Sequence, residues 1–410
     1  MSEYDADELQ APVWLNDSFL EHAVQNFEKD SSIKIINGCE LRPATKGGDH
    51  YASIMFRTTV RYRSERQLDE KTLKLVIKAQ PTAEGFKKEL TKDNSLFGTE
   101  IKMYSEILPA MKKLLEDAGE RMEFPRLIYA ATNPNAVIML EDIAPYGWLP
   151  GRTPVRSFEE VLFTVRNIAK FHATSLYLQQ STMDLSGFNV DQFWTSGPVF
   201  AIFSRGFDEL CSGLAAWPEC AVYVEKFRNL KDSFQERCQQ VFAANPPSEG
   251  YNVLNHADFQ FKNLMHKKDS EDRIVDSMLI DFQCCHWGSP AIDVLSLVDL
   301  IVDMETKMAH RNEIIYEYYQ HFAMILRKIG YTGKIPSLVD LQVELLRKGF
   351  QELVHTAVES FKYADLTEST FDDYNAGNLD INKCYIDKSF LRFICTELES
   401  LLYRGLLEAE

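Results

Sequence analysis

The sequence has few basic residues for its length and no long apolar run. Among 410 residues, 44 Lys and Arg stand against 61 Asp and Glu, which gives a formal net charge of −17 at pH 7. That balance argues against a protein that mainly holds nucleic acid or anionic lipid, because both need Lys and Arg. No apolar run approaches the ~20 residues that span a membrane, and the acidic N-terminus does not resemble a secretory signal. We therefore expect a cytoplasmic protein with neither nucleic acid nor membrane as a partner.

Cysteine is also sparse: eight residues are scattered along the chain without a Cys-x-x-Cys pair. This pattern indicates neither a zinc site nor a disulfide framework, so we expect reduced, mostly buried thiols. Disorder is excluded by an aromatic content of 12%. With 45% apolar residues, a chain of 410 residues exceeds one ordinary core, and the composition predicts two lobes.

The apolar pattern changes once along the chain. Between residues 33 and 80, short β-rich runs predict antiparallel strands at 53–62 and 73–78, and 136–140 is a further strand. Apolar residues between 91 and 113 recur at three- and four-residue steps, which predicts an amphipathic helix. Later in the chain, helical spacing covers 158–177, 222–242, 312–329, 337–361 and 388–407, interrupted by strands near 265 and at 278–280.

These elements predict an α+β fold with two lobes. Residues 1–140 form the small β-rich lobe with one helix, and residues 152–410 form the larger, mostly helical lobe. Between them, residues 141–151 contain two prolines and two glycines and are the predicted hinge.

The strongest chemical signal lies in the second lobe. An apolar strand runs into His256-Ala257-Asp258, and Asn263 follows five residues after Asp258. This spacing lets Asp258 face a hydroxyl group while the Asn263 oxygen turns towards a metal, as in a kinase catalytic loop. Asp281 ends another buried strand, where magnesium would supply the missing partner for its carboxylate. Alone, Asp258 would equally fit a turn or a helix cap, but the two motifs together in this order disfavour that alternative. We expect His256 to brace the loop rather than to transfer a proton.

The first lobe contains the groups that such chemistry needs. Lys78 ends a strand, where it would face phosphates, and Glu100 on the following helix would hold it through an ion pair. A strand-end lysine in solvent is the alternative. Upstream, the backbone amides of Gly47 and Gly48 and the hydroxyl of Ser53 could cover phosphates, although a plain hairpin turn explains the glycines equally well. Neither a Walker loop nor Gly-x-Gly-x-x-Gly occurs.

The residues quoted so far resemble the insect ecdysteroid-kinase-like family with its CHK kinase-like domain, within the superfamily of aminoglycoside and choline phosphotransferases. The resemblance covers nearly the whole chain, and Asp281-Phe282-Gln283 followed by 288–293 is its most specific part. It implies a bilobal protein-kinase-like fold. It also implies phosphorylation of a hydroxyl on a small molecule by ATP with Mg²⁺, the acceptor being an ecdysteroid-like steroid or a hydroxylated xenobiotic.

Carried over by motif, the resemblance assigns individual roles. Asp258 would be the catalytic base, and Asn263 and Asp281 would be the magnesium ligands. Lys78 would bind phosphate with Glu100 as its brace, and the backbone from Glu141 to Ile143 would hold the adenine.

Two alternatives remain open. A protein kinase uses the same groups, but only eleven residues separate Asp281 from Asp293, which leaves no room for a long activation segment. Small-molecule acceptors are therefore favoured.

The second alternative is an inactive relative that binds a nucleotide or another small ligand. It is motivated by Ala257, which stands where the family usually has Gly: if the loop needs a positive φ there, Ala adds about 1 kcal/mol of strain.

Overall fold

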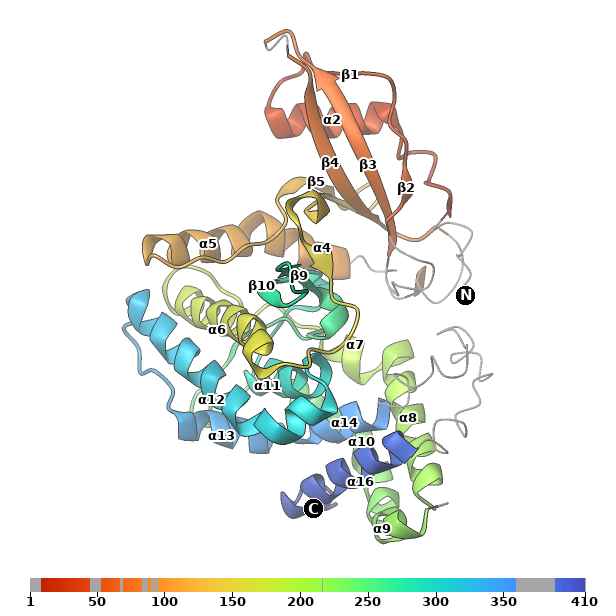
Figure 1. Cartoon of the computed structure of the whole chain (residues 1–410), viewed down its shortest axis with the longest axis vertical. Coiled ribbons are helices and arrows are strands. Elements are labelled where there is room, and N and C mark those ends of the chain that lie inside the picture. The colour runs from red at the N-terminus through yellow and green to blue at the C-terminus, as the bar shows by residue number, and fades with distance from the viewer. Residues whose placement is uncertain are drawn as a thin grey trace. The chain divides into compact units, whose positions relative to one another are not determined.

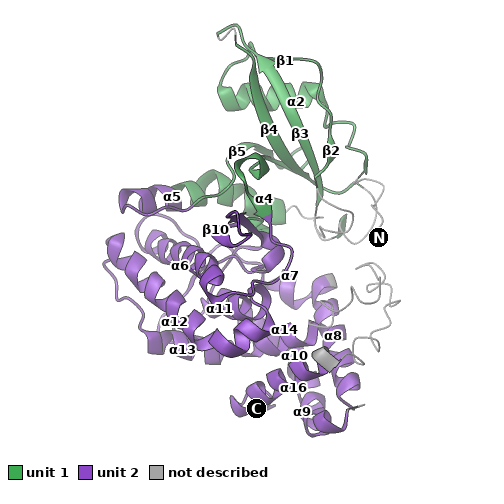
Figure 2. Cartoon of the chain, viewed as in Figure 1, with its two compact units in different colours: residues 1–110, 123–149, 280–283 green, residues 111–122, 150–279, 284–410 purple. Residues whose placement is uncertain are grey.

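The computed structural model describes residues 9–44, 53–66, 69–82, 88–89, 91, 95–215, 217–358 and 388–409 (Figure 1). The chain divides into two compact units (Figure 2). Unit 1 comprises residues 1–110, 123–149 and 280–283, and unit 2 comprises residues 111–122, 150–279 and 284–410. The step from Leu149 to Pro150 lies within the predicted hinge. The sequence pattern did not indicate that 280–283 would join the first unit or that 111–122 would join the second.

The described part of unit 1 contains one six-stranded antiparallel sheet in the order β1-β3-β4-β6-β5, with β2 paired to β3. Its strands are β1 (Lys34–Ile35), β2 (Arg42–Pro43), β3 (Ile54–Arg63), β4 (Lys71–Ala79), β5 (Leu127–Ala131) and β6 (Val137–Glu141). Its helical elements are α2 (Asp17–Glu28), α4 (Ser95–Lys102) and a π-helical turn (Met103–Ile107) that leads into α5 (Leu108–Asp117). The strands expected at 53–62, 73–78 and 136–140 are β3, β4 and β6. Helix α2 was not expected.

Both faces of this sheet are covered, and this positions Lys78. Side chains of α2 pack against Ile77 and its neighbours on one face. On the other face, Phe97 of α4 packs with Ile138 of β6. Lys78 lies directly opposite Ile138 in the pairing of β4 with β6. Directly paired residues share a face of a sheet, so Lys78 lies on the face that carries α4.

Unit 2 is mostly helical. Its helices are α6 (Phe158–Ser181), α7 (Asp191–Thr195), α8 (Gly197–Ala215), α9 (Ala221–Leu230), α10 (Phe234–Phe242), α11 (Ala291–Ser296), α12 (Met304–Lys328), α13 (Leu338–Arg347), α14 (Phe350–Val358) and α16 (Lys388–Tyr403). Its strands are β8 (Val253–Asn255), β9 (Leu264–Lys268), β10 (Ile274–Leu279) and β11 (His286–Gly288), and β7 (Leu149–Pro150) lies at the boundary with unit 1. Short turns of 3₁₀ or π helix lie at Ala144–Tyr146, Pro218–Cys220, Lys231–Ser233, Phe261–Asn263, Phe282–Cys284 and Leu297–Ile301.

Two of the expected long helices are each divided in two. The run expected at 222–242 becomes α9 and α10, separated by the 3₁₀ turn, and the run expected at 337–361 becomes α13 and α14. Gly349 lies at the second break. A Cβ atom there would lie 2.8 Å from the end of the Leu406 side chain, so a larger residue at this position would displace Leu406.

The core of unit 2 lies around α6 and α12, which pack against each other, while β10 also packs on α6. Strands β9 and β10 form an antiparallel hairpin, and β8 pairs with β11. The two short sheets thereby fix both ends of the loop that carries Asp258. Of the described helices, none is both long and apolar enough to cross a membrane. A small β-rich unit and a larger helical unit confirm the predicted α+β fold class.

Candidate functional site

The side chain of Lys78 is the centre of a buried polar cluster in unit 1. It is 6% exposed. Its Nζ donates hydrogen bonds to Glu100 Oε2 at 2.6 Å, to Asp281 Oδ1 at 2.6 Å and to Gln283 Oε1 at 3.0 Å. The three donors of an ammonium group are therefore matched by three oxygens. The structure contains the ion pair expected between β4 and the following helix.

Charge within this cluster is unbalanced. Burial by itself lowers the pKa of Lys78, but Asp281 and Glu100 outweigh it, and the pKa lies above its ordinary value. Burial raises the pKa of Glu100 to about 7, against the opposing effect of Lys78. Two carboxylates share one ammonium, so Lys78 stays charged, and the raised pKa of Glu100 makes protonation of this carboxylate easier.

Asp281 reaches Lys78 from a constrained backbone. Its φ is +65°, a left-handed conformation that Asp tolerates better than most residues. The next residue, Phe282, is 2% exposed and packs edge-to-face on Tyr104, with 5.6 Å between ring centroids. Gln283 then turns back to Lys78. The sequence predicts magnesium as a partner of the Asp281 carboxylate, and in this structure the carboxylate also has Lys78 as a partner.

The loop after β8 in unit 2 holds Asp258 and Asn263 together. Nδ2 of Asn263 donates to Oδ2 of Asp258 and to its backbone carbonyl, each at 2.8 Å. Gln260 Nε2 donates to Oδ1 of the same carboxylate at 2.8 Å. Both carboxylate oxygens thus accept a hydrogen bond, and the side chain of Asp258 is fixed. The spacing of five residues produces this contact because the chain makes a 3₁₀ turn at Phe261–Asn263.

Asp293 fixes the backbone just before Asp258. It is fully buried and accepts the N–H of His256 at 2.6 Å and the N–H of Ala257 at 2.9 Å. His172 of α6 lies 3.0 Å from the same carboxylate, and its other ring nitrogen lies 2.7 Å from the hydroxyl of Tyr318 on α12. The packed pair α6 and α12 therefore supports the loop through Asp293.

Ala257 adopts the positive φ that the sequence analysis considered, at +61°. For an L-residue this costs about 1–2 kcal/mol.

The ring of His256 packs near Phe259, with 6.1 Å between centroids, and His256 is fully buried. The backbone N–H of His256 helps to fix the loop through Asp293.

The backbone from Glu141 to Ile143 was expected to hold an adenine, and two of its N–H groups have partners within the protein. Glu141 N–H donates to Arg126 O at 2.9 Å, and Asp142 N–H donates to Lys74 O at 2.8 Å. For the N–H of Ile143, the described residues provide no acceptor.

The glycine-containing turn can be described only in part. Ser53 is buried, at 2% exposure, directly before β3. Gly47 and Gly48 lie outside the described residues.

The sequence matches the ecdysteroid kinase-like family over residues 47–331. The chain belongs to the ecdysteroid kinase-like family. The matched range contains every predicted site residue, and membership supports a small-molecule phosphotransferase. A search of curated proteins finds no match.

Several solved structures are similar to this chain. One is a putative aminoglycoside phosphotransferase from Ralstonia eutropha JMP134, 13% identical, with a TM-score of 0.42 over 97% of this chain and 99% of that one. Another is the choline kinase LicA from Streptococcus pneumoniae, 10% identical, with a TM-score of 0.34 over 90% of this chain and 98% of that one. A third is an ADP-bound aminoglycoside phosphotransferase, 16% identical, with a TM-score of 0.34 over 81% and 97% of the two chains.

Sequence reasoning gave no role to several residues that shape the site of this ecdysteroid kinase-like protein. Gln283 and Gln260 each bind a predicted site residue, yet a lone glutamine carries no spacing signal. Asp293 ends the segment 288–293 that carries the resemblance, but its function in holding the loop together with His172 follows from contacts between distant segments. A buried Asp shortly after a Gly-Ser-Pro turn is the one signal that could have indicated Asp293.

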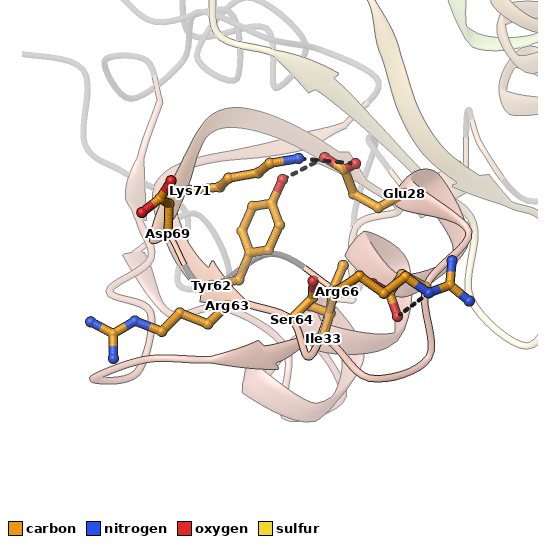
Figure 3. Close-up of a pocket in the computed structure, with 9 residues that line it drawn as sticks. Glu28, Ile33, Tyr62, Arg63, Ser64, Arg66, Asp69 and Lys71 are labelled. Atoms are coloured by element: carbon orange, nitrogen blue, oxygen red, sulfur yellow. Dashed lines mark hydrogen bonds and ion pairs between the residues drawn. The ribbon is translucent and has the colours of Figure 1, made fainter.

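A cavity of about 160 Å³ in unit 1 contains none of the predicted site residues. It lies beside β3, β4 and α2 and is lined by Glu28, Asp30, Ile33, Tyr62, Arg63, Ser64, Arg66, Asp69 and Lys71 (Figure 3). Tyr62 donates to Glu28 at 2.5 Å, and Lys71 lies 3.6 Å from the same carboxylate. Arg66 lies 3.7 Å from Asp30, so several of the charged groups that line this cavity are paired within it.

Proposed function

We propose that this protein transfers the γ-phosphoryl group of ATP to a hydroxyl group of a small molecule, either an ecdysteroid-like steroid or a hydroxylated xenobiotic. The observation that carries this proposal is the buried ammonium of Lys78, held at 2.6 Å by both Glu100 and Asp281. Burying a charge is costly unless it is paired, and here two carboxylates hold the ammonium in a fixed position. A fixed cation among acidic groups is the arrangement that phosphoryl transfer uses to hold nucleotide phosphates.

Residues of unit 1 would bind the nucleotide. Lys78 would donate to phosphate oxygens in place of one of its three present acceptors, and Glu100 would keep the ammonium in position. The backbone from Glu141 to Ile143 would hold the adenine, and the N–H of Ile143 would donate a hydrogen bond to it. The backbone of Gly47 and Gly48 and the hydroxyl of Ser53 would cover the phosphates.

Residues of unit 2 would act on the acceptor. Asp258 would orient the acceptor hydroxyl and take its proton as the oxygen attacks phosphorus. Gln260 and Asn263 support this role because they hold the carboxylate from both sides, which lowers the number of orientations that it samples. Positioned proton transfer of this kind contributes about 10²- to 10⁴-fold in rate.

The side chains of Asn263 and Asp281 fit a magnesium ion by their chemistry. Asn263 uses Nδ2 for Asp258, and no described residue donates to its carboxamide oxygen. Asp281 offers a carboxylate that is 19% exposed. Both are oxygen ligands of the kind that Mg²⁺ prefers. When bound, magnesium would neutralise charge on the phosphate groups.

Binding of ATP and turnover test this proposal separately. We expect Mg-ATP, and not ATP with EDTA, to raise the melting temperature of the wild type and of Asp258→Asn. A nucleotide at 100 times its Kd adds about 2.7 kcal/mol of stability. Lys78→Met should lose most of this shift. The matched control is Asp272→Asn, because the side chain of Asp272 is 83% exposed.

Phosphate transfer is then measured from [γ-³²P]ATP to a panel of ecdysteroids and hydroxylated xenobiotics. The wild type and Asp272→Asn should phosphorylate at least one acceptor, and Asp258→Asn should not. Nucleotide binding without turnover on the whole panel would instead support the second candidate, an inactive relative that binds a nucleotide or another small ligand. Absence of any nucleotide binding by the wild type would end the kinase proposal.

A further inference from the structure

Two cysteines from distant parts of unit 2 lie in contact. Cys220 ends the 3₁₀ turn before α9, and Cys395 lies in α16, 175 residues later. Their Sγ atoms are 3.0 Å apart. All seven cysteines in the described part of the chain are free thiols, and Cys384 lies outside it. A sulfur pair at this distance needs little movement to form a covalent bond.

The surrounding packing holds the two sulfur atoms in place. Cys220 belongs to an apolar cluster that also contains Ile394 and Leu398 of α16 on either side of Cys395. Between Ile394 and Leu398 on α16, Glu397 pairs with Lys307 of α12. Helix α16 is thus fixed by apolar and ionic contacts, so the contact between the sulfur atoms is part of a packed interface.

The two thiols differ in their exposure. Cys220 is fully buried, whereas Cys395 is partly exposed. Burial, and then the hydrogen bond with Cys395, raise the pKa of Cys220 to about 12. An oxidant in solution therefore reaches Cys395 first, and Cys220 is the neighbour that can react with the product.

We propose that Cys220 and Cys395 form a reversible disulfide when the protein meets a hydroperoxide such as hydrogen peroxide. The Cys395 sulfur attacks one peroxide oxygen, the O–O bond breaks, and Cys395 becomes a sulfenic acid as the first water leaves with the thiol proton. The Cys220 sulfur then attacks the Cys395 sulfur, the S–O bond breaks, and the departing hydroxide takes the Cys220 proton as the second water. Two thiols lose two electrons, and one peroxide gains them.

The bond would tie α16 to the start of α9. Because the two cysteines are 175 residues apart, the disulfide closes a long loop and restricts the unfolded chain strongly. This property is independent of the proposed phosphotransferase activity, since it needs neither nucleotide nor acceptor.

Peptide mapping of the full chain after hydrogen peroxide treatment tests the proposal. Free thiols are blocked with iodoacetamide before non-reducing digestion. In the wild type we expect a peptide pair linked through Cys220 and Cys395, an intact mass lower by about 2 Da, and loss of the link after dithiothreitol. Cys238→Ala is the matched control, because Cys238 is equally buried in the same apolar cluster and its pKa is also raised to about 12. It should form the link as the wild type does.

Two variants assign the order of the steps. Cys220→Ala should accumulate a sulfenic acid at Cys395 that dimedone traps, and Cys395→Ala should leave Cys220 unmodified at the same peroxide concentration. Cys220→Ser serves in the same way if Cys220→Ala fails to fold. Folded wild type that gains only sulfinic or sulfonic acid at Cys395, or a link from Cys395 to Cys384, would overturn the proposal.

Discussion

Lys78→Met removes the ammonium from the buried cluster of unit 1 and keeps a flexible side chain of similar length. In the wild type, Nζ lies 2.6 Å from the carboxylates of Glu100 and Asp281. The side chain of Glu100 is 3% exposed, whereas that of Asp281 is 19% exposed. The variant therefore keeps Glu100 as a buried carboxylate without its cation, while Asp281 can still contact water.

The expected cost depends on pH. Removing one partner of a buried ion pair costs about 3–5 kcal/mol, because a buried charge is left unpaired. Protonation of Glu100 removes that charge. Burial already raises the pKa of Glu100 to about 7 while Lys78 opposes the effect, so in Lys78→Met the pKa is higher still. A carboxyl group with a raised folded-state pKa contributes stability at low pH and loses it as the pH rises through that pKa. Above pH 7, the free energy of unfolding of the variant should therefore fall relative to that of the wild type by up to about 1.4 kcal/mol per pH unit.

Urea unfolding followed by circular dichroism at pH 6, 7, 8 and 9, with EDTA present, measures this difference. Lys74→Met is the matched control, because Lys74 lies on the same strand with an exposed side chain, and it should show the wild-type pH profile. Adding Glu100→Gln to Lys78→Met should remove the extra pH dependence and recover stability at pH 9. A parallel profile for Lys78→Met and wild type, or no recovery in the double variant, would refute the assignment of Glu100 as the buried charge.

Three further substitutions test unit 2 by urea unfolding. Asp293→Asn should cost about 3 kcal/mol, because an amide cannot replace the carboxylate that accepts two backbone N–H groups; a loss below 1 kcal/mol would contradict this. Ala257→Gly should stay within about 1 kcal/mol of wild type, since relief of the positive φ is offset by the lost methyl group and the freer unfolded chain. Burial lowers the pKa of His266 to about 4, so the stability contributed by its neutral ring is present above pH 6.5 and is lost as the pH falls to 4, by up to about 3 kcal/mol. His266→Leu should therefore lose less stability than wild type between pH 6.5 and 4.5, and equal losses would exclude His266 as the cause.

The fold could be predicted from the sequence where periodicity is strong. Strand β3 alternates between buried and exposed side chains over its whole length, and that pattern is visible in the residues alone. Helix α2 carried a usable signal that was overlooked, because Asn16 caps it and apolar residues follow at helical spacing. The break between α13 and α14 occurs at Gly349, a residue that disfavours helix and is visible in the sequence, whereas the packing of Leu406 close to this glycine is a contact between distant residues that no local pattern indicates. Local pattern therefore gives the elements, and distant packing decides where some of them end.

In the candidate site, too, contacts that follow a known spacing could be predicted and contacts between distant residues could not. The pair of Lys78 with Glu100 could be predicted because a strand and the next helix commonly supply these two residues in kinases. The contact of Lys78 with Asp281 spans 203 residues, and its contact with Gln283 spans 205. No spacing rule reaches that far. The sequence predicted Asp281 as an acid that needs a cation, but it could not indicate that Lys78 contacts this carboxylate.

The hydrogen bonds of the loop around Ala257 determine whether alanine in place of glycine disturbs the position of Asp258. The positive φ costs about 1–2 kcal/mol. Against it stand the hydrogen bonds from the N–H groups of His256 and Ala257 to the buried carboxylate of Asp293, each worth about 1.5–3 kcal/mol because the acceptor is charged. The bonds outweigh the strain, so the backbone keeps its conformation and Asp258 stays between Gln260 and Asn263. Alanine in place of glycine is therefore a cost that this loop absorbs, and by itself it gives no support to an inactive protein.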